Sequence, residues 1–474
     1  MDNKKPLFSN KELIHIILPL ILQQVLAVTI GMVDTLMVSS AGEAAVSGVS
    51  LVNSLDTLLV IAFGALVSGG AVVVAQFLGQ KNREGALSSA KQLLYSSTAV
   101  ALAITVIGLL LHNFLLNLLF GDVEPDVMQN AKDYFIWVAF SFPFLAINNA
   151  GGAIYRVMGN SMMSMLISVM MNILNAGGNA VLIYGFGLGA SGAAISTLFA
   201  RIVGTVVTLS LLRSHKNTVY VDKYLDYKPD FRIIKEILRI GVPNGIENSM
   251  FHFGKLLTQS LISSMSTAAI AANAVAAALA NYQYMPGTAM ANTMVTVVGR
   301  CVGAEEKEQA KRYSRILISA TYVCLWVVVL VTFFIAKPVI GIYDLSPEGS
   351  EIAYDLIIYH AICAALIWPA AFTLPSALRA ASDVRFPLVI SMFSMWTFRV
   401  GLSFYFSLDV VKIFGFSFAG LGMGPLGVWV AMTVDWVFRA ILFAWRYLSG
   451  KWLTKYKKIA KSFNGSLARA VCLG

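Results

Sequence analysis

Charge is the scarcest feature of this sequence. Charged residues make up only 13% of its 474 positions, whereas hydrophobic residues make up 57%. A soluble chain of this length needs more charge to cover its surface, so this composition excludes an ordinary soluble globular protein. Apolar runs of roughly 20 residues, long enough to span a bilayer, recur along the whole chain. The sequence therefore predicts an all-α polytopic membrane protein.

Cysteine and histidine are also rare. The four cysteines, Cys301, Cys324, Cys363 and Cys472, are widely separated, which predicts neither a disulfide framework nor a metal site. The five histidines are dispersed and form no HExxH motif. We therefore expect no catalytic residues, no cofactor and no enzymatic activity. A membrane-embedded enzyme is kept only as a remote alternative.

The apolar runs predict twelve transmembrane helices. Their expected ranges are 13–38, 47–78, 91–119, 131–158, 161–184, 189–213, 237–265, 269–299, 312–336, 351–380, 386–410 and 424–448.

The net charge of +10 is distributed unevenly across these spans. If the N-terminus lies inside, only Lys132, Lys337 and Lys412 fall in outer connections, and nearly all other Lys and Arg lie on the inner side. This asymmetry follows the positive-inside rule and predicts two cytoplasmic termini in the cell (inner or plasma) membrane. We expect the basic tail 449–474 to lie against anionic lipid rather than nucleic acid.

The two halves of the chain resemble each other. At one constant offset in numbering (243 − 19), Pro19 aligns with Pro243 and Gly79 with Gly303, and we call this the repeat offset. Six spans per half give parallel repeats, an arrangement in which secondary transporters bind substrate in a central cavity between lobes. The expected domains are an N-lobe, a cytoplasmic linker, a C-lobe and the tail, at 1–212, 213–236, 237–448 and 449–474.

Two glycine-rich segments also recur in the two halves. GLGASG (187–192) and GMGPLG (422–427) both match the dinucleotide fingerprint GxGxxG. Neither follows a soluble strand, and each precedes the last span of its half, so we interpret both as tight turns rather than nucleotide sites.

Asp34 lies within the first apolar run. A buried carboxylate is energetically costly, so an intramembrane acid is a candidate ion or proton site. A solvated residue near a helix end is the alternative. Pro19, earlier in the same run, predicts a helix kink, either static or part of a switch.

The fifth and sixth spans offer polar partners. Asn175 and Asn179 are four positions apart and share a helix face, while Ser196 and Thr197 open the sixth span. Together with Asp34 they form an oxygen ligand set for Na⁺. Interhelical hydrogen bonding is the alternative role for the amides.

Other residues are weaker candidates. We expect Met163, Met170, Asn172 and Asn149 to contribute to a substrate cavity, because flexible thioethers suit varied apolar ligands, although ordinary packing would also explain the methionines. Glu247 is a second-lobe candidate for an ion or substrate site. It could instead pair with a cation of the opposite lobe.

Several segments together resemble the multidrug and toxic compound extrusion (MATE) family. They are MVDTLMVSSAG (32–42), VAQFLGQKN (74–82), YRVMGN (155–160), GASGAAIST (189–197) and GVPNGIEN (241–248). Their order and spacing carry the resemblance, which covers roughly residues 10–450.

The resemblance implies two six-helix lobes around a central cavity, rocker-type alternating access and export of amphipathic or cationic compounds against Na⁺ or H⁺. It places Asp34 and Pro19 at an essential aspartate and its proline kink, and Asn175 and Thr197 at two further site residues. Asn179 stands where one branch of the family has an aspartate. Trp368 stands where another branch has an acid, which makes a second-lobe cation site of that type doubtful.

The sequence and the resemblance together predict a monomeric secondary antiporter. A lipid-linked oligosaccharide flippase of the same superfamily is the alternative. Convergence of Arg201, Lys255, Arg399 and Arg439 in one cavity would favour the flippase.

Overall fold

The computed structural model describes residues 6–121, 123–222, 224, 228–413 and 416–454. The chain divides into two compact units, Met1–Gly245 and Ile246–Gly474. The predicted tail lies outside the described residues from position 455 onward. The boundaries expected for the lobes and linker stay a prediction.

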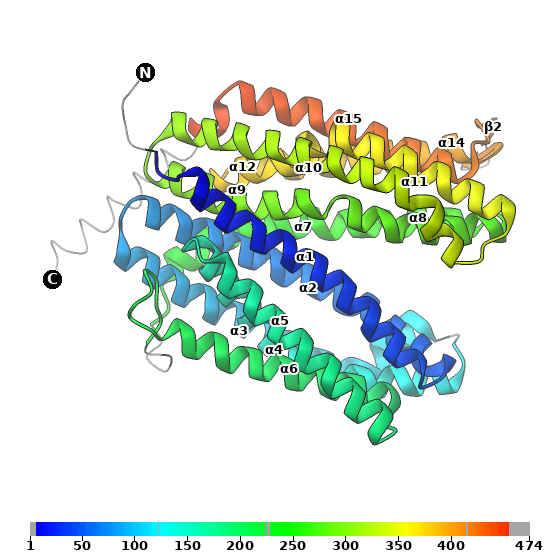
Figure 1. Cartoon of the computed structure of the whole chain (residues 1–474), viewed down its shortest axis with the longest axis horizontal. Coiled ribbons are helices and arrows are strands. Elements are labelled where there is room, and N and C mark those ends of the chain that lie inside the picture. Colours follow the sequence, from blue (N-terminus) through cyan, green and yellow to red (C-terminus); the bar gives the residue numbers. More distant parts are fainter. Residues whose placement is uncertain (1–5, 122, 223, 225–227, 414–415, 455–474) are drawn as a thin grey trace. The chain divides into compact units, whose positions relative to one another are not determined.

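The first unit is a bundle of long helices (Figure 1). A capping box formed by Ser9 and Glu12 begins the first of them and satisfies backbone N–H groups that lack an intrahelical partner. Helix α4 packs against α2, α3 and α6, while α5 packs against α1 and α6. The helices are α1 (Asn10–Ser39), α2 (Glu43–Gly79), α3 (Arg83–Phe120), α4 (Pro125–Val157), α5 (Ser161–Asn179), the π-helical η1 (Ala180–Gly185), α6 (Gly189–Leu212) and the first part of α7 (Phe231–Ser263).

The second unit is also mainly helical. It contains the rest of α7 and one antiparallel hairpin, β1 (Val410–Ile413) and β2 (Phe416–Ala419), which the sequence analysis does not predict. Its other helices are α8 (Thr267–Gln283), α9 (Met285–Gly303), α10 (Lys307–Ile342), α11 (Pro347–Trp368), η2 (Pro369–Thr373), α12 (Leu374–Ala380), α13 (Arg385–Ser394), η3 (Met395–Gly401), α14 (Leu402–Ser407) and α15 (Gly424–Leu448).

Ten helices within the described residues are long and apolar enough to cross a membrane. The two predicted spans outside this set correspond to α7 and to the consecutive helices α8 and α9. Helix α7 carries charged residues such as Arg232, Glu236 and Lys255. Helix α8 ends before Tyr284, and α9 begins after it with Pro286 in its first turn. The charges of α7 and the proline at the start of α9 therefore explain why ten of the described helices, and not twelve, are long and apolar enough to cross a membrane.

Large apolar side chains remain exposed along the helices. Leu110 and Phe334 are 77% and 81% exposed, and both lie within apolar helices. The buried core of the first unit instead gathers residues such as Phe63, Phe135 and Phe142. Apolar side chains on both the inside and the outside are expected for helices surrounded by lipid.

Helix boundaries recur at the repeat offset found in the sequence. Three helices of the second half begin at that same offset from their counterparts (267 − 43, 307 − 83 and 385 − 161). This agreement confirms the internal repeat as a structural one. The paired starts are Glu43 and Thr267, Arg83 and Lys307, and Ser161 and Arg385.

The two glycine-rich segments are tight turns, as predicted. Gly187 and Gly189 have φ values of +67° and +52°, and Gly422 and Gly424 have +61° and +58°. Residues with a side chain rarely adopt such φ values, so glycine is favoured where each turn enters the last long helix of its half.

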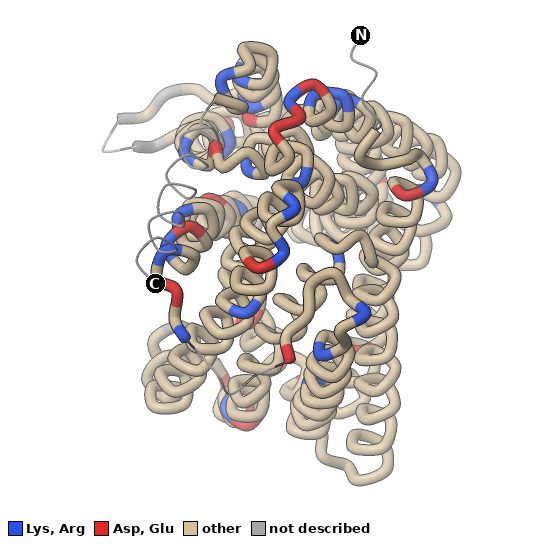
Figure 2. The backbone as a smooth tube through the Cα atoms, turned by 90° about the vertical axis from the view of Figure 1, so that its left-hand side faces the viewer, with Lys and Arg blue, Asp and Glu red and all other residues tan. Residues whose placement is uncertain are grey.

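Many Lys and Arg residues lie on helix ends and connections (Figure 2). Lys81 and Arg83 flank the α2–α3 connection, and Arg213 follows α6. In a bundle whose helices alternate in direction, these connections share one end of the unit. The orientation of that end in the membrane stays a prediction.

Gly48 and Gly64 of α2 provide a matched test of the packing. A methyl group at Gly48 would lie 2.8 Å from the backbone of α4, whereas one at Gly64 would meet nothing within 4 Å. We expect Gly48→Ala to destabilise the protein by about 1–3 kcal/mol. Gly64→Ala should be neutral or stabilising by up to about 1 kcal/mol. Thermal unfolding in detergent measures both, and equal effects would contradict the close packing of α2 on α4.

Candidate functional site

Asp34 lies in the last part of α1 and is half-buried. The Asn179 side-chain amide, at the end of α5, donates a hydrogen bond to the Asp34 carboxylate. Asn179 is completely buried, and its own Oδ1 has no donor among the described residues. A carboxylate oxygen and an unpaired amide oxygen are therefore close together inside an apolar helix bundle.

Asn175 lies one helical turn before Asn179 and contacts α6. Its Nδ2 donates to Thr197 Oγ1 at 3.0 Å, and Ser196 Oγ donates to the Asn175 carbonyl at 2.6 Å. The structure thus brings together the predicted polar residues of the first, fifth and sixth spans. Their contacts are interhelical hydrogen bonds, which join α1 to α5 and α5 to α6.

Arg201 lies one turn after Thr197 on α6. It forms an ion pair with Asp56 of α2 at 3.5 Å and donates to Ser141 Oγ of α4 at 2.6 Å. Asp56 is not among the residues predicted from the sequence, although the rule that singles out Asp34 applies equally to a carboxylate within the second apolar run. The cluster therefore contains two carboxylates.

The charges in this cluster do not cancel. Asp34 and Asp56 carry two negative charges, and Arg201 carries one positive charge within electrostatic range of both. One negative charge remains uncompensated in a region where burial of charge is costly. A proton or one monovalent cation bound at Asp34 would neutralise it.

Pro19 lies inside α1, which continues on both sides of it. Proline has no N–H, so it cannot donate to the carbonyl of His15 one turn earlier, and the helix is weaker at that point. The predicted kink and its role stay a prediction.

The residues expected in the substrate cavity do not form a group in the hydrogen-bond network. Met163, Met170, Asn172 and Asn149 are all half-buried, and their role stays a prediction. The neighbouring Asn148 is the amide that contacts α6, donating to the Arg201 carbonyl at 3.0 Å and accepting from Thr208 at 3.1 Å.

Glu247 pairs within its own unit. The Arg379 guanidinium contacts its carboxylate at 2.7 Å, and Ser391 Oγ donates to the same oxygen at 2.7 Å. The alternative of a partner in the opposite lobe is therefore wrong. No local sequence pattern predicts this pair, because the two residues lie 132 positions apart.

Trp368 lies in an aromatic cluster. Its ring stacks on Tyr284 with centroids 5.8 Å apart and planes 8° apart, and on Phe372 at 5.2 Å. A neutral aromatic side chain therefore occupies the position at which, according to the resemblance, another branch of the family has an acid.

Comparison with known proteins identifies the fold. The structure matches that of a multidrug resistance MATE family transporter of the MOP superfamily in an outward-facing conformation, with a TM-score of 0.85 and 19% identity. The match covers 94% of this chain and 96% of that chain. It shows that the chain has the MATE fold.

Curated relatives match over nearly their full length. The chain is 27% identical to the uncharacterized transporter YisQ of Bacillus subtilis over 95% of its own length and 97% of YisQ. It is also 27% identical to the probable multidrug resistance protein NorM of Thermotoga maritima, with 93% of each chain covered.

The family model described as MatE matches the chain twice, at residues 19–181 and 243–405. The two matches are separated by the repeat offset (243 − 19 and 405 − 181). Together they cover more than half of the sequence. The chain therefore belongs to the MATE family, whose members are multi-pass membrane transporters and not enzymes.

Proposed function

We propose that this protein is a secondary antiporter that exports amphipathic or cationic small molecules in exchange for H⁺ or Na⁺, with Asp34 as the coupling group. The observation that carries the proposal is the uncompensated negative charge of the Asp34, Asp56 and Arg201 cluster. The relative NorM, described as a probable multidrug resistance protein, supports efflux of several compounds.

Coupling requires that the ion and the substrate favour different states of the transporter. In the proposed mechanism, an outside cation or proton neutralises Asp34 and weakens its charge-assisted hydrogen bond with Asn179. The contact between α1 and α5 then rearranges and substrate is released outward. Alternating access by a monomer, with both termini in the cytoplasm, is part of this proposal.

The ligand set suits either ion. Na⁺ prefers oxygen ligands, and Asp34, Asn179 Oδ1 and Thr197 supply carboxylate, amide and hydroxyl oxygens. Only one of these three is charged, which limits the electrostatic attraction for Na⁺. A proton needs only the carboxylate.

The flippase alternative has less support. Three of the four cations proposed to distinguish it are paired with acids: Arg201 with Asp56 at 3.5 Å. Arg439 and Arg399 both pair with Asp435, at 2.7 Å and 3.9 Å. Lys255 and Arg399 line a pocket of the second unit.

Glu247 is better explained as a structural residue. Its carboxylate oxygen already accepts from Arg379 and Ser391, and the side chain is 9% exposed. A carboxylate held in this way is less suited to bind a coupling ion than Asp34.

Replacing Asp34 tests the coupling role. We expect Asp34→Asn to abolish efflux of a fluorescent cation from proteoliposomes under separate Na⁺ and pH gradients, because the amide cannot change its charge. Asp126→Asn makes the same change at an exposed position of the same unit and should retain efflux. Native rates in Asp34→Asn would remove Asp34 from the mechanism.

Replacing Asn179 tests the choice of ion. Asn179→Asp adds a second carboxylate beside Asp34, and two carboxylates attract Na⁺ more strongly than one. We expect efflux to respond to Na⁺ at concentrations at least tenfold lower than in the native protein. Asn113→Asp makes the same change at an exposed position of the same unit and is the control. An unchanged Na⁺ response in Asn179→Asp would argue against Na⁺ binding at this cluster.

Breaking the Glu247–Arg379 pair tests the structural role. Glu247→Gln leaves a largely buried guanidinium without its charged partner, so we expect a loss of about 3–5 kcal/mol in stability. Lys311→Gln breaks the exposed pair with Glu308, which water and salt screen, and should change the stability far less. Thermal unfolding gives both values. A stable Glu247→Gln protein that has lost gradient-driven efflux would instead assign Glu247 to coupling.

A further inference from the structure

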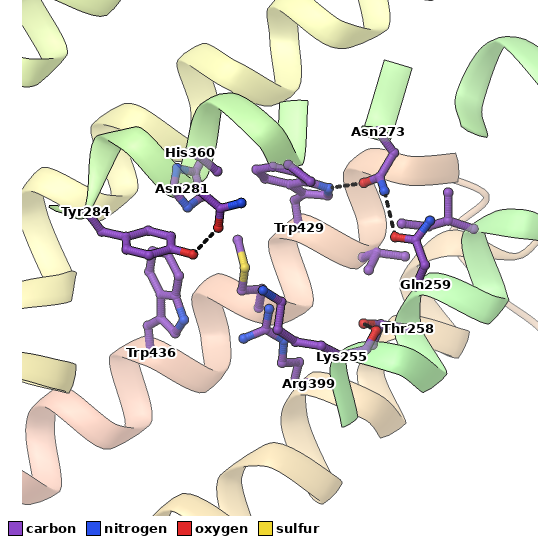
Figure 3. Close-up of a pocket in the computed structure, with 15 residues that line it drawn as sticks. Lys255, Thr258, Gln259, Asn273, Asn281, Tyr284, His360, Arg399, Trp429 and Trp436 are labelled. Carbon is purple, nitrogen blue, oxygen red and sulfur yellow. Dashed lines mark hydrogen bonds between the residues drawn. The ribbon is translucent and has the colours of Figure 1, made fainter. Parts of the chain in front are cut away.

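The second unit contains a pocket of about 110 Å³, several times the space that one ordered water needs (Figure 3). Its walls come from helices α7, α8, α11 and α15 and from η3. The residues that line it include Lys255, Thr258, Tyr284, Arg399 and Trp436.

The internal repeat relates this pocket to the Asp34 cluster. At the repeat offset, Thr258 is the counterpart of Asp34 (258 − 34) and Arg399 is the counterpart of Asn175 (399 − 175). The scaffold position that carries an acid in the first unit is therefore neutral in the second, and a position that carries an amide is cationic.

The last long helices of the two halves, α6 and α15, also differ in the charge of corresponding residues. The positive-φ glycines Gly189 and Gly424, which begin these helices, set their relative alignment (424 − 189). In that alignment Trp436 is the counterpart of Arg201 (436 − 201). An aromatic wall in the second unit thus corresponds to the ion-paired arginine of the first.

Positive charge in this pocket is only partly neutralised. The Lys255 ammonium has no hydrogen-bond or ion-pair partner in the described part of the chain, and Arg399 Nη1 is buried without a hydrogen-bond partner there. The carboxylate nearest to Arg399 is Asp435 at 3.9 Å, and Arg439 already contacts Asp435 at 2.7 Å. The three cations Lys255, Arg399 and Arg439 are therefore accompanied by one carboxylate, that of Asp435.

Aromatic rings and ordered amides complete the pocket. Tyr284 and Trp436 line it, and the Trp436 Nε1 donor is buried with no acceptor among the described residues. Asn273 accepts from Trp429 Nε1 at 2.9 Å and donates to Gln259 at 3.0 Å, which fixes one wall (Figure 3). The pocket combines unpaired donors with a rigid apolar surface.

We propose that this pocket binds the anionic group of an amphipathic aromatic acid, with Lys255 and Arg399 as its ligands. The carboxylate would accept charge-assisted hydrogen bonds from both cations, and the aromatic portion would pack against Tyr284 and Trp436. The second unit thereby extends the substrate range to organic anions and zwitterions. That extension rests on the proposed export function, whereas binding itself does not.

The test uses three ligands of one shape and different charge. Isothermal titration calorimetry of the full chain in phosphatidylcholine nanodiscs would compare 4-phenylbutyrate with neutral 4-phenylbutanamide and cationic 4-phenylbutylamine. We expect the anion to bind at least tenfold more tightly than either analogue. Lys255→Gln should weaken the anion tenfold or more and leave the amide unchanged, and Arg399→Gln should act in the same direction.

Lys337→Gln is the matched control, because Lys337 lies over the Tyr354 ring and is not part of the pocket. Lys255→Gln keeps the test valid if Arg399→Gln folds poorly, since no described side chain depends on the Lys255 ammonium. Equal binding of the three ligands, or native affinity in Lys255→Gln, would overturn the proposal. Competition by a soluble short-chain phospholipid but not by other aromatic acids would also overturn it and assign the pocket to lipid phosphate.

These binding measurements use no ion gradient, whereas the efflux assay of Asp34→Asn follows a cation. Failure of the anion pocket and failure of the antiport proposal are therefore distinguishable.

Discussion

The contact between Asp34 and Asn179 is the interaction on which the functional interpretation depends. It joins α1 to α5 through a carboxylate that pairs with no arginine or lysine in the described part of the chain. The nearby arginine, Arg201, is already committed to Asp56. An apolar bundle tolerates such a charge only if something compensates for it, and a coupling ion from water is the simplest source of compensation.

The second unit shows that one scaffold can support the opposite polarity. Helix boundaries recur at the repeat offset, and paired glycines turn the chain before α6 and α15. These features fix backbone positions and leave the side chains free to change, so Asp34 corresponds to Thr258 and Asn175 to Arg399. The proposed ion site and the proposed anion pocket would then be two outcomes of one backbone arrangement.

Much of this arrangement could be predicted from the sequence. Apolar runs gave the membrane helices, the repeat gave the two related halves, and helical spacing placed Asn175 and Asn179 on one face. Contacts between distant segments could not be predicted in this way. Asp56 has no helical-spacing relation to Arg201, and Arg379 lies 132 positions from Glu247. The pocket was missed for the same reason, because its lining comes from helices that only tertiary packing brings together.

The position of Asp34 on α1 gives its charge a direct mechanical consequence. A hydrogen bond to an ionised carboxylate is roughly twice as strong as one between neutral groups. If Asp34 is the coupling group, as proposed, protonation or ion binding there would weaken the attachment of α1 to α5 without removing any residue from the contact. Pro19 lies in the same helix, where a missing backbone donor makes bending less costly. A change of one unit of charge thus acts on a helix already weakened at one point, and local electrostatics can become movement of that helix.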